Sequence, residues 1–317
     1  MNVLIIALSN LGDSILTVPA IQAVREKFPE ARFDVLAGPK TEEFFKGDPG
    51  FRKVFIWKKK IPLWSQVGLV LRLMAGGYRL VIDFKNTLIP FFLVGAKRTP
   101  FRRAFLKEFP HRIDQHLALV KAIGIPPPKE PPRLFFSPED ERKAEEWLRS
   151  LGPDGSDGLV VAVVPGAKSH LKRWAPEKFA SVADRLAVER EAKILLIGGL
   201  EDRGETFAVK QRMHYPALDL AGHTSLKEVA ALLARTDLVI TNDTANLHAA
   251  QITGVPTVAI FGPTDERKYG PKNPNSAVIR KRLICAPCEK ALCQYHHECM
   301  KWLEAKEVYA AAVKLLR

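Results

Sequence analysis

The sequence predicts an α/β protein built from two doubly wound parallel sheets, on three observations. Short apolar runs such as 159–164 and 238–241 are typical of strands that are buried on both faces, as in a parallel sheet. These runs alternate with segments of helical apolar spacing, which supply the crossovers that parallel strands need. The length of 317 residues exceeds that of one ordinary domain, so we expect two domains.

In the first half of the chain, apolar runs predict strands at 3–8, 32–37, 53–57 and 78–83. After the first strand, residues 9–14 form a small polar turn, and the apolar spacing from Ile15 to Val24 indicates a helix that ends near Phe28. Pro19 is acceptable near the first turn of this helix, where a backbone N–H is not needed. A second helix is expected at 67–74.

A proline-rich segment, IPPPKEPP at 125–132, marks the approach to a domain boundary because neither a helix nor a central strand tolerates it. Ser137 before Pro138 is a typical helix start, and a glycine-rich loop follows at 152–158. We therefore place the break across 126–158 and expect domains of residues 1–150 and 151–317. The last helix, 302–317, is expected to pack back on the first domain.

In the second half, strands are expected at 159–164, 193–197, 218–220, 238–241 and 255–261. Polar turns follow these strands, and the turn at 242–244 precedes a short helix at 245–252 that Gly254 closes. Ligands of open α/β sheets bind beyond the carboxyl ends of the strands, and a helix N-terminus there favours phosphate. The pattern therefore predicts a phosphate-containing ligand in the second domain.

Two of these turns carry a specific signature. Residues 243–248 read DTANLH and residues 261–265 read FGPTD. They resemble the D-T-G-x-x-H and F-G-P-T-D elements of glycosyltransferase family 9, the lipopolysaccharide heptosyltransferase type. Ala245 stands where this family usually has glycine, and its Cβ restricts how closely a ligand approaches the backbone. The resemblance covers nearly the whole chain and includes the family's G-D-x-x-x-T-x-P element, matched at residues 12–19.

The resemblance implies a GT-B fold, in which two Rossmann-like domains face each other across a cleft. It implies that the first domain holds the acceptor and the second the nucleotide sugar, with heptose moving from ADP-heptose to a lipopolysaccharide inner-core acceptor with inversion. Asp13 would be the general base, since a carboxylate must remove the acceptor hydroxyl proton as its oxygen attacks C1. The alternative is that Asp13 only caps the following helix.

Lys172 lies in a turn that resembles the family's K-x-W-P element, with Ala175 inserted, and is expected to stabilise the departing diphosphate. The alternative is an ordinary surface cation. Further donor-binding residues are expected at Lys168, Ser169, Asp202, Thr224, Asp243, Thr244, Ala245 and His248. Asp202 would face the ribose, with Glu201 and Glu205 as competitors, and the backbone near Thr224 would read the adenine. No D-x-D metal motif is present, so catalysis is expected to need no cofactor.

The chain has a formal net charge of +13, and residues 1–150 contribute 25 Lys and Arg against 16 Asp and Glu. Such a field attracts nucleic acid, anionic lipid or an acidic substrate. No nucleic-acid-binding motif accompanies it, so we expect an anionic glycolipid acceptor and an anionic membrane surface as partners. The expected acceptor groove comprises Lys58, Lys59 and Lys60 and a basic cluster with interleaved phenylalanines at 97–112; a solvated charged face is the alternative.

Four cysteines lie close together near the C-terminus, at Cys285, Cys288, Cys293 and Cys299. Four thiols in so short a span suggest a structural zinc site, although the spacing is not that of two C-x2-C knuckles. Buried free thiols and two disulfides are the alternatives. A cytoplasmic chain disfavours disulfides.

No apolar run reaches the ~18 residues of a membrane span, and residues 1–8 do not read as a signal peptide. We therefore expect a cytoplasmic protein, peripheral on the inner face of the inner membrane. Three other functions stay open at this point. They are transfer with another nucleotide sugar or acceptor, epimerisation of a nucleotide sugar on a GT-B fold, and non-catalytic binding of an anionic glycolipid.

Overall fold

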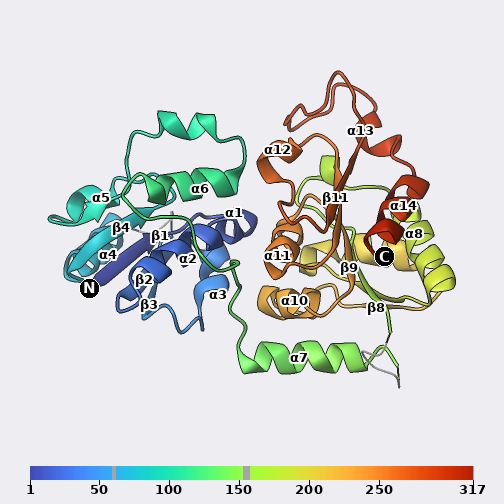
Figure 1. Cartoon of the computed structure of the whole chain (residues 1–317), viewed down its shortest axis with the longest axis horizontal. Coiled ribbons are helices and arrows are strands. Elements are labelled where there is room, and N and C mark those ends of the chain that lie inside the picture. The colour runs from blue at the N-terminus through green and yellow to red at the C-terminus, as the bar shows by residue number, and fades with distance from the viewer. Residues whose placement is uncertain (59–61, 153–157, 317) are drawn as a thin grey trace. The chain divides into compact units, whose positions relative to one another are not determined.

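The computed structural model describes residues 1–58, 62–152 and 158–316, and it divides the chain into two compact units (Figure 1). Unit 1 comprises Met1–Phe135 and unit 2 comprises Phe136–Arg317. Each unit has its own parallel sheet and its own apolar core. None of the described helices is long and apolar enough to cross a membrane.

Unit 1 is built on a five-stranded sheet in the order β3-β2-β1-β4-β5, and every neighbouring pair is parallel. Its strands are β1 (Asn2–Ile6), β2 (Arg32–Ala37), β3 (Lys53–Ile56), β4 (Tyr78–Asp83) and β5 (Lys97–Arg98). Its helices are α1 (Leu11–Ile15), α2 (Val18–Lys27), α3 (Glu42–Phe45), α4 (Leu63–Met74), α5 (Ile89–Phe92) and α6 (Arg112–Lys121), with 3-10 turns η1 (Pro39–Thr41) and η2 (Ala104–Glu108).

The sheet of unit 1 is covered on both faces, as the apolar runs of its central strands predict. Side chains of β1 alternate between two core clusters: Val3 and Ile5 join residues of α2 and α6, whereas Leu4 and Ile6 join residues of α4. The single helix expected from residue 15 to 28 is two helices, because α1 ends at Ile15 and Thr17 is the N-cap of α2. Pro19 lies in the first turn of α2, where its ring is tolerated.

Unit 2 is built on a six-stranded parallel sheet in the order β11-β10-β9-β6-β7-β8. Its strands are β6 (Val160–Val164), β7 (Lys193–Leu196), β8 (Ala217–Asp219), β9 (Leu238–Asn242), β10 (Thr257–Phe261) and β11 (Ser276–Arg280). Its helices are α7 (Pro138–Arg149), α8 (Pro176–Arg190), α9 (Arg203–Lys210), α10 (Leu226–Leu233), α11 (Ala245–Thr253), α12 (Glu266–Tyr269), α13 (Glu298–Lys301) and α14 (Ala305–Leu315), with 3-10 turns η3 (His170–Lys172) and η4 (Leu200–Asp202).

The boundary between the units lies inside the expected span, but helix α7 belongs to unit 2 and not to the first domain of residues 1–150. Ser137 and Asp140 form a capping box that starts α7. The helix then packs on α10, where Lys143 Nζ lies 2.7 Å from Glu228 Oε1 and the side chains of Ala144 and Leu148 are buried. Because α7 packs on α10, residues 136–150 belong to unit 2.

The last helix, α14, has its place in the core of unit 2. Val308 and Ala312 are fully buried, and the helix packs against α8 and the strands β9, β10 and β11. Tyr309 Oη donates a hydrogen bond of 2.5 Å to Glu189 at the end of α8. This packing completes the core of unit 2, and the expected return of residues 302–317 to the first domain stays a prediction.

Candidate functional site

The turns that follow β6, β7, β8, β9 and β10 lie at one edge of the sheet of unit 2, because these strands are all parallel. The strand order reverses between β6 and β9, which is the topological switch point where ligands of such sheets bind. All expected donor-binding residues lie in these turns or at the start of α11: Lys168, Ser169 and Lys172 after β6, Asp202 after β7, Thr224 after β8, and Asp243, Thr244, Ala245 and His248 after β9.

An ion pair occupies the switch point itself. Lys172 Nζ lies 2.6 Å from Asp243 Oδ2, and the Asp243 side chain is 6% exposed whereas that of Lys172 is 33% exposed. Asn242, the last residue of β9, fixes the two turns to each other. Its Oδ1 accepts the Trp174 N–H at 3.2 Å, and its Nδ2 donates to the Pro165 carbonyl at 2.8 Å. The cation is thus held at a defined place, with one face accessible to a ligand.

Helix α11 begins beside this ion pair. Thr244 is its N-cap, and the Thr244 hydroxyl accepts the Asn246 N–H at 3.1 Å. The helix ends at Gly254, whose φ of 81° is the left-handed value that favours glycine. His248 lies on the buried side of the helix with 5% exposure, and its ring centroid is 6.4 Å from that of Tyr269. The start of α11 therefore offers its backbone amides, whereas His248 is largely covered.

Asp202 lies against the turn after β6, in space that two glycines leave open. A Cβ on Gly166 would be 2.2 Å from Asp202 Cγ, and a Cβ on Gly198 would be 2.6 Å from Asp202 Cβ. The Gly199 N–H donates to Asp202 Oδ2 at 3.0 Å, yet burial dominates and raises the pKa of the Asp202 carboxyl. Of its two competitors, Glu205 forms an ion pair with Arg173. Glu201 is exposed.

The turn after β8 separates the roles of Thr224 and Ser225. Ser225 forms a capping box with Glu228 and starts α10. The Thr224 hydroxyl oxygen is buried and finds no hydrogen-bond partner among the described residues. A buried hydroxyl without a partner is costly, so this oxygen is suited to meet a ligand.

In unit 1, Asp13 follows β1 and lies in the first turn of α1. It is not the cap of that helix, because Asn10 holds the N-cap position. Asn10 Nδ2 instead donates to Asp13 Oδ2 at 3.0 Å, which orients the half-buried carboxylate. The sequence did not single out Asn10, although an amide three residues before an acid in a turn is a local signal for such a contact.

The expected acceptor residues are described only in part. Lys58 follows β3 and is exposed, whereas Lys59 and Lys60 lie outside the described residues. The basic cluster at 97–112 does not form one surface. Arg103 turns inward and donates to the carbonyls of Asp83 and Phe84, and burial lowers its pKa. Phe105 packs on the core of unit 1, while other members of the cluster stay exposed.

The FGPTD segment at 261–265 is in close contact with the neighbouring cysteine-containing loop. A Cβ on Gly262 would be 2.4 Å from Met300 Sδ, so only glycine fits without a shift. The Pro263 carbonyl accepts the N–H groups of Cys288 and Glu289 at 3.0 and 2.9 Å. Asp265 is the N-cap of α12 and accepts the Arg267 N–H. This motif therefore anchors the cysteine-containing loop to β10.

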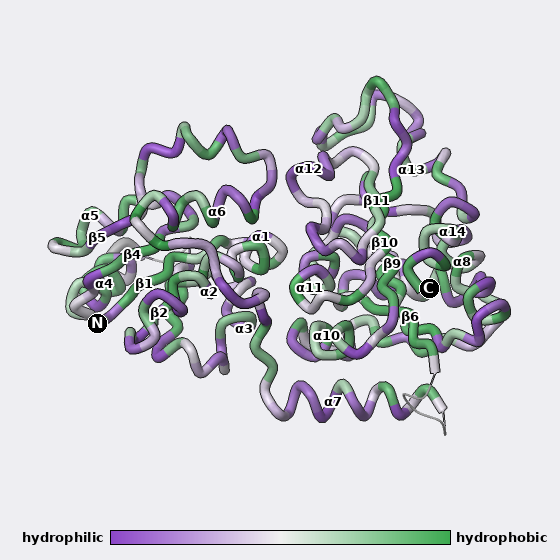
Figure 2. The backbone as a smooth tube through the Cα atoms, viewed as in Figure 1, coloured by the Kyte–Doolittle hydropathy of each residue, from purple (hydrophilic) through white to green (hydrophobic). Residues whose placement is uncertain are grey.

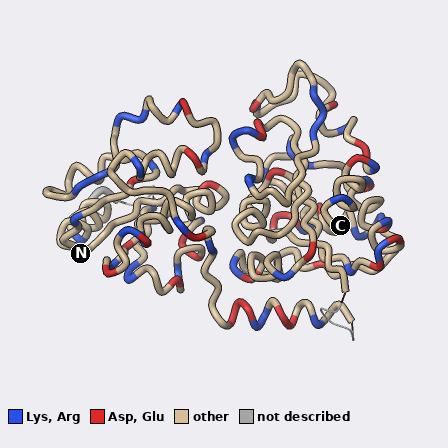
Figure 3. Tube along the Cα trace, in the orientation of Figure 1, with Lys and Arg blue, Asp and Glu red and all other residues tan. Residues whose placement is uncertain are grey.

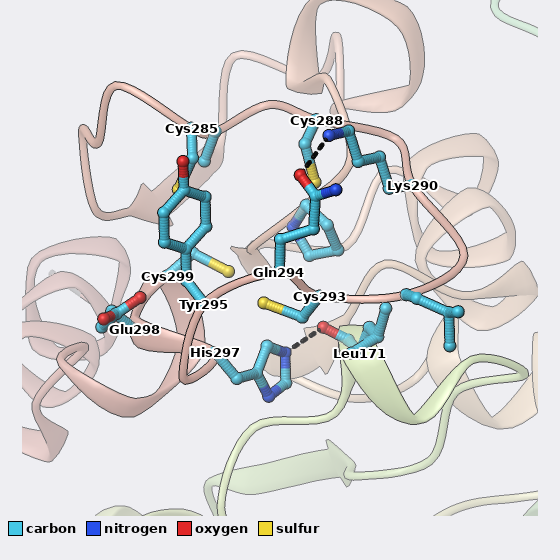
Figure 4. A pocket seen from close by; sticks show the side chains of 13 residues that line it. Leu171, Cys285, Cys288, Lys290, Cys293, Gln294, Tyr295, His297, Glu298 and Cys299 are labelled. Carbon is cyan, nitrogen blue, oxygen red and sulfur yellow. Dashed lines mark hydrogen bonds between the residues drawn. The ribbon is translucent and has the colours of Figure 1, made fainter.

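The four cysteines line one cavity of about 190 Å³ in unit 2 (Figure 4). All four are free thiols in this structure, as one of the alternatives expects. Burial, together with the three neighbouring thiols, raises the pKa of Cys299 to about 11. The cavity adjoins the turn that carries Lys172, because His297 Nε2 lies 2.5 Å from the Leu171 carbonyl oxygen.

No three His, Cys, Asp or Glu side chains of the described chain meet in an arrangement that could hold a metal ion. The zinc site stays a prediction, which elemental analysis of the purified protein tests.

Comparison with known proteins fits this geometry. The model of glycosyltransferase family 9 (heptosyltransferase) matches residues 72–298. The chain belongs to this family. Its relatives include lipooligosaccharide heptosyltransferase 2 of Campylobacter jejuni, which is 27% identical over 319 residues that span 97% of this chain and 96% of the relative.

Solved structures of family 9 enzymes have the same fold. A glycosyltransferase family 9 protein from Veillonella parvula aligns with a TM-score of 0.84 at 22% identity, over 99% of this chain and 97% of that one. The ADP-heptose LPS heptosyltransferase II of Escherichia coli aligns with a TM-score of 0.80 at 22% identity, over 100% and 98% of the two chains. The expected GT-B fold is confirmed, and the protein is a glycosyltransferase.

Proposed function

We propose that this family 9 enzyme moves heptose from ADP-heptose to an inner-core acceptor of lipopolysaccharide, with inversion at the anomeric carbon. Two relatives support the substrates: the one from C. jejuni is a lipooligosaccharide heptosyltransferase, and the E. coli enzyme is an ADP-heptose LPS heptosyltransferase. In the proposed reaction the acceptor oxygen attacks C1, the bond from C1 to the diphosphate oxygen breaks, and its electrons leave with ADP.

The observation that carries the proposal is the ion pair of Lys172 and Asp243 at the switch point of unit 2, 2.6 Å apart and next to the start of α11. In the proposed complex the diphosphate replaces Asp243 as the partner of the Lys172 ammonium. The Asp243 carboxylate then accepts hydrogen bonds from hydroxyls of the sugar. Backbone N–H groups at Thr244 and Ala245 and the dipole of α11 add to the stabilisation of the leaving ADP.

The remaining donor contacts follow from the neighbouring turns. Asp202 lies beside the turn after β6 and accepts the two ribose hydroxyls in the proposed complex. The buried Thr224 hydroxyl, together with the backbone around it, faces the adenine. Lys168 and Ser169 lie in the same turn as Lys172, one exposed and one half-buried, and contact the phosphates.

Asp13 is the proposed general base. Its carboxylate follows the carboxyl end of β1, is half exposed and is held by the Asn10 amide, so an acceptor hydroxyl can reach it. It takes the hydroxyl proton as the acceptor oxygen attacks C1. Lys58, exposed after β3, contacts a phosphate of the lipid core. This acceptor places the enzyme at the cytoplasmic face of the inner membrane.

The proposed chemistry uses Lys172 and helix amides to bear the charge of the diphosphate, so EDTA is expected to leave the rate unchanged. The decisive experiment incubates the protein with labelled ADP-heptose, with and without heptose-free inner-core acceptor. Transfer requires acceptor and supports the proposal. Epimerisation without acceptor, or binding without any turnover, contradicts it. Transfer from a different nucleotide sugar alone would keep the reaction class and correct the donor.

A further inference from the structure

Helix α4 of unit 1 has two apolar faces, and only one of them is used by the core. Leu69 and Leu73 are buried against the sheet. Four further apolar side chains project outward with 47–76% exposure: Trp64, Val67, Leu71 and Met74. At 3.6 residues per turn these four fall within an arc of about 80°, on the side opposite the buried leucines. A globular helix normally presents polar side chains there.

The exposed apolar surface continues beyond α4. Helix α5 packs next to α4, and Ile89 and Leu93 belong to the same core cluster as Leu69. Their neighbours in sequence point outward, with 45–92% exposure: Leu88, Phe91, Phe92, Val94 and Phe101. Among the described residues of unit 1, every exposed large apolar side chain except Met1 lies between 64 and 101. We call these nine exposed residues, which lie on α4 or between residues 88 and 101, the α4–α5 surface. Figure 2 labels the two helices α4 and α5.

The charge of this region has one sign. Residues 62–107 contain eight Lys and Arg and a single acid, Asp83. That acid is 2% exposed and accepts the backbone N–H groups of Lys85, Asn86 and Thr87, so it adds little negative charge to the surface. Exposed cations lie close in sequence to these apolar side chains, at Arg72, Lys97, Arg98 and Arg102. Figure 3 colours Lys and Arg blue along the chain.

One contact directly joins the cations of this region to its exposed apolar side chains. The Arg98 guanidinium lies over the Phe91 ring, 4.3 Å from its centroid, and Phe91 packs edge-to-face on Phe101 at 5.4 Å. The aromatic side chains therefore stand in a fixed cluster beside the cation. Aromatic and aliphatic groups framed by Lys and Arg are the composition that inserts into the headgroup region of an anionic bilayer.

We propose that the α4–α5 surface is where the enzyme docks on an anionic phospholipid bilayer, with Trp64, Leu71 and Phe92 inserted and the cations on phosphate headgroups. The positive charge of this surface favours an anionic bilayer over a second copy of this chain as the occupant. A two-fold interface would bring the same cations opposite each other, with the nearby acid already bonded to backbone. Single exposed apolar side chains are normal on a protein surface, whereas nine of them in one segment indicate an interaction site.

This inference rests on the proposed function in that it names the surface by which unit 1 reaches a membrane-embedded acceptor. Its test needs neither donor nor acceptor. The whole protein is sedimented with vesicles of phosphatidylethanolamine and phosphatidylglycerol, and with vesicles of phosphatidylcholine alone. Binding only to the anionic vesicles, weakened by high salt, is expected. Absence of binding to anionic vesicles overturns the inference, whatever the transfer assay gives.

Two variants locate the surface. Trp64→Ser with Leu71→Ser leaves Leu69 and Leu73 in the core and is expected to weaken vesicle binding ~10-fold or more. Lys97→Glu with Arg102→Glu is expected to abolish the preference for anionic lipid. Matched controls in α9 of unit 2 are Phe207→Ser, at a site of 60% exposure, and Lys210→Glu. Equal loss in the controls, or wild-type binding by the first variant, overturns the inference.

A depth measurement excludes binding by charge alone. Brominated lipids in the vesicles quench the fluorescence of an inserted tryptophan, so Trp64 is expected to be quenched. Trp64→Phe keeps the apolar anchor, and this variant is expected to bind vesicles as the wild type does while losing most of the quenching. Unchanged quenching in Trp64→Phe would show that another surface inserts. A protein that dimerises through Trp64 and Leu71, seen by light scattering, would also contradict the inference.

Discussion

Units 1 and 2 have the same strand order around their first strand, yet they carry different chemistry. In both sheets the strand order reverses between the first and fourth strands of the unit. These are β1 and β4 in unit 1 and β6 and β9 in unit 2. Residues 1–135 contain 22 Lys and Arg against 11 Asp and Glu, whereas residues 136–317 contain 26 against 24. Unit 1 is thus strongly cationic, and unit 2 is nearly neutral.

The difference lies in the turns after the strands and not in the sheets themselves. In unit 2 the switch point holds a lysine paired with an aspartate, and further charged side chains of its turns are also paired, as in Arg173 with Glu205. In unit 1 the turn after β1 presents Asp13 bonded to an amide, and the excess positive charge lies around α4 and α5. One fold thus carries a carboxylate suited to accept a proton in one half and a cation suited to hold an anion in the other.

The largest expected effect separates the two units by function. Asp13→Asn removes the proposed base and should lower kcat by ~10²–10⁴-fold, because the acceptor proton then has no carboxylate to receive it. Affinity for ADP, measured by calorimetry, should not change, since the proposed donor site lies in unit 2. Asn10→Ala removes only the hydrogen bond that orients the Asp13 carboxylate, so it should lower kcat by about tenfold or less. Full activity of Asp13→Asn would remove the base from the mechanism.

Lys172→Met should weaken both donor binding and rate, with kcat/KM reduced by ~10²–10³-fold. It also leaves Asp243 buried without its cation, so thermal stability should fall. Adding Asp243→Asn should restore the melting temperature but not the rate, which separates the structural from the chemical role. The surface variant Lys210→Met serves as control. If Lys172→Met alone keeps the wild-type affinity for ADP, the anion site must be placed elsewhere.

Gly166→Ala tests how closely Asp202 is fitted into unit 2. The added Cβ would meet the Asp202 carboxyl at 2.2 Å, so that side chain must move. We expect a loss of ~1–3 kcal/mol in the free energy of unfolding and a higher KM for the donor. Gly204→Ala in α9 is the matched control, since nothing lies within 4 Å of its Cβ, and it should stabilise slightly. Equal behaviour of the two variants would argue against a fitted carboxylate.

The smallest effect concerns pH. Burial raises the folded-state pKa of Asp202, so the ionised form costs stability at pH values above that pKa. Below the unfolded pKa of about 3.9 both states are protonated and the cost vanishes. Asp202→Asn should therefore raise the free energy of unfolding at pH 7 and leave it unchanged near pH 3, as denaturant titration measures. A variant less stable at pH 7 would show that the Gly199 hydrogen bond outweighs burial.

Much of this fold could be predicted from the sequence where apolar runs are long or caps are distinct. The strands at 32–37 and 78–83 match β2 and β4, and Ser137 starts α7 as expected. Strand β11 was missed, because its five residues are all half-buried and form no clear apolar run. The start of α4 at Leu63 was missed as well, since Trp64 points away from the core and breaks the expected spacing.

For the candidate site, the sequence indicates individual residues but not how they are arranged. Family motifs indicated Lys172 and Asp243, yet their pairing depends on β6 and β9 being neighbours, and the two residues are 71 positions apart. Local sequence does not give strand order. The same holds for Gly166 and Asp202, whose contact needs β6 beside β7. The contacts of the FGPTD segment with the cysteine loop were not predicted either, because they join residues that are distant in sequence.

The pairing of Lys172 with Asp243 has a consequence for selectivity. An empty site that already contains its own counterion exerts little pull on inorganic phosphate or on other small anions of the cell. To bind, a ligand must displace the Asp243 carboxylate from Lys172 with an anion of higher charge. It must also offer the released carboxylate hydrogen-bond donors. A diphosphate joined to a polyhydroxylated sugar meets both demands, and free ADP meets only the first. Intact donor should therefore outcompete spent nucleotide, which favours turnover over product inhibition.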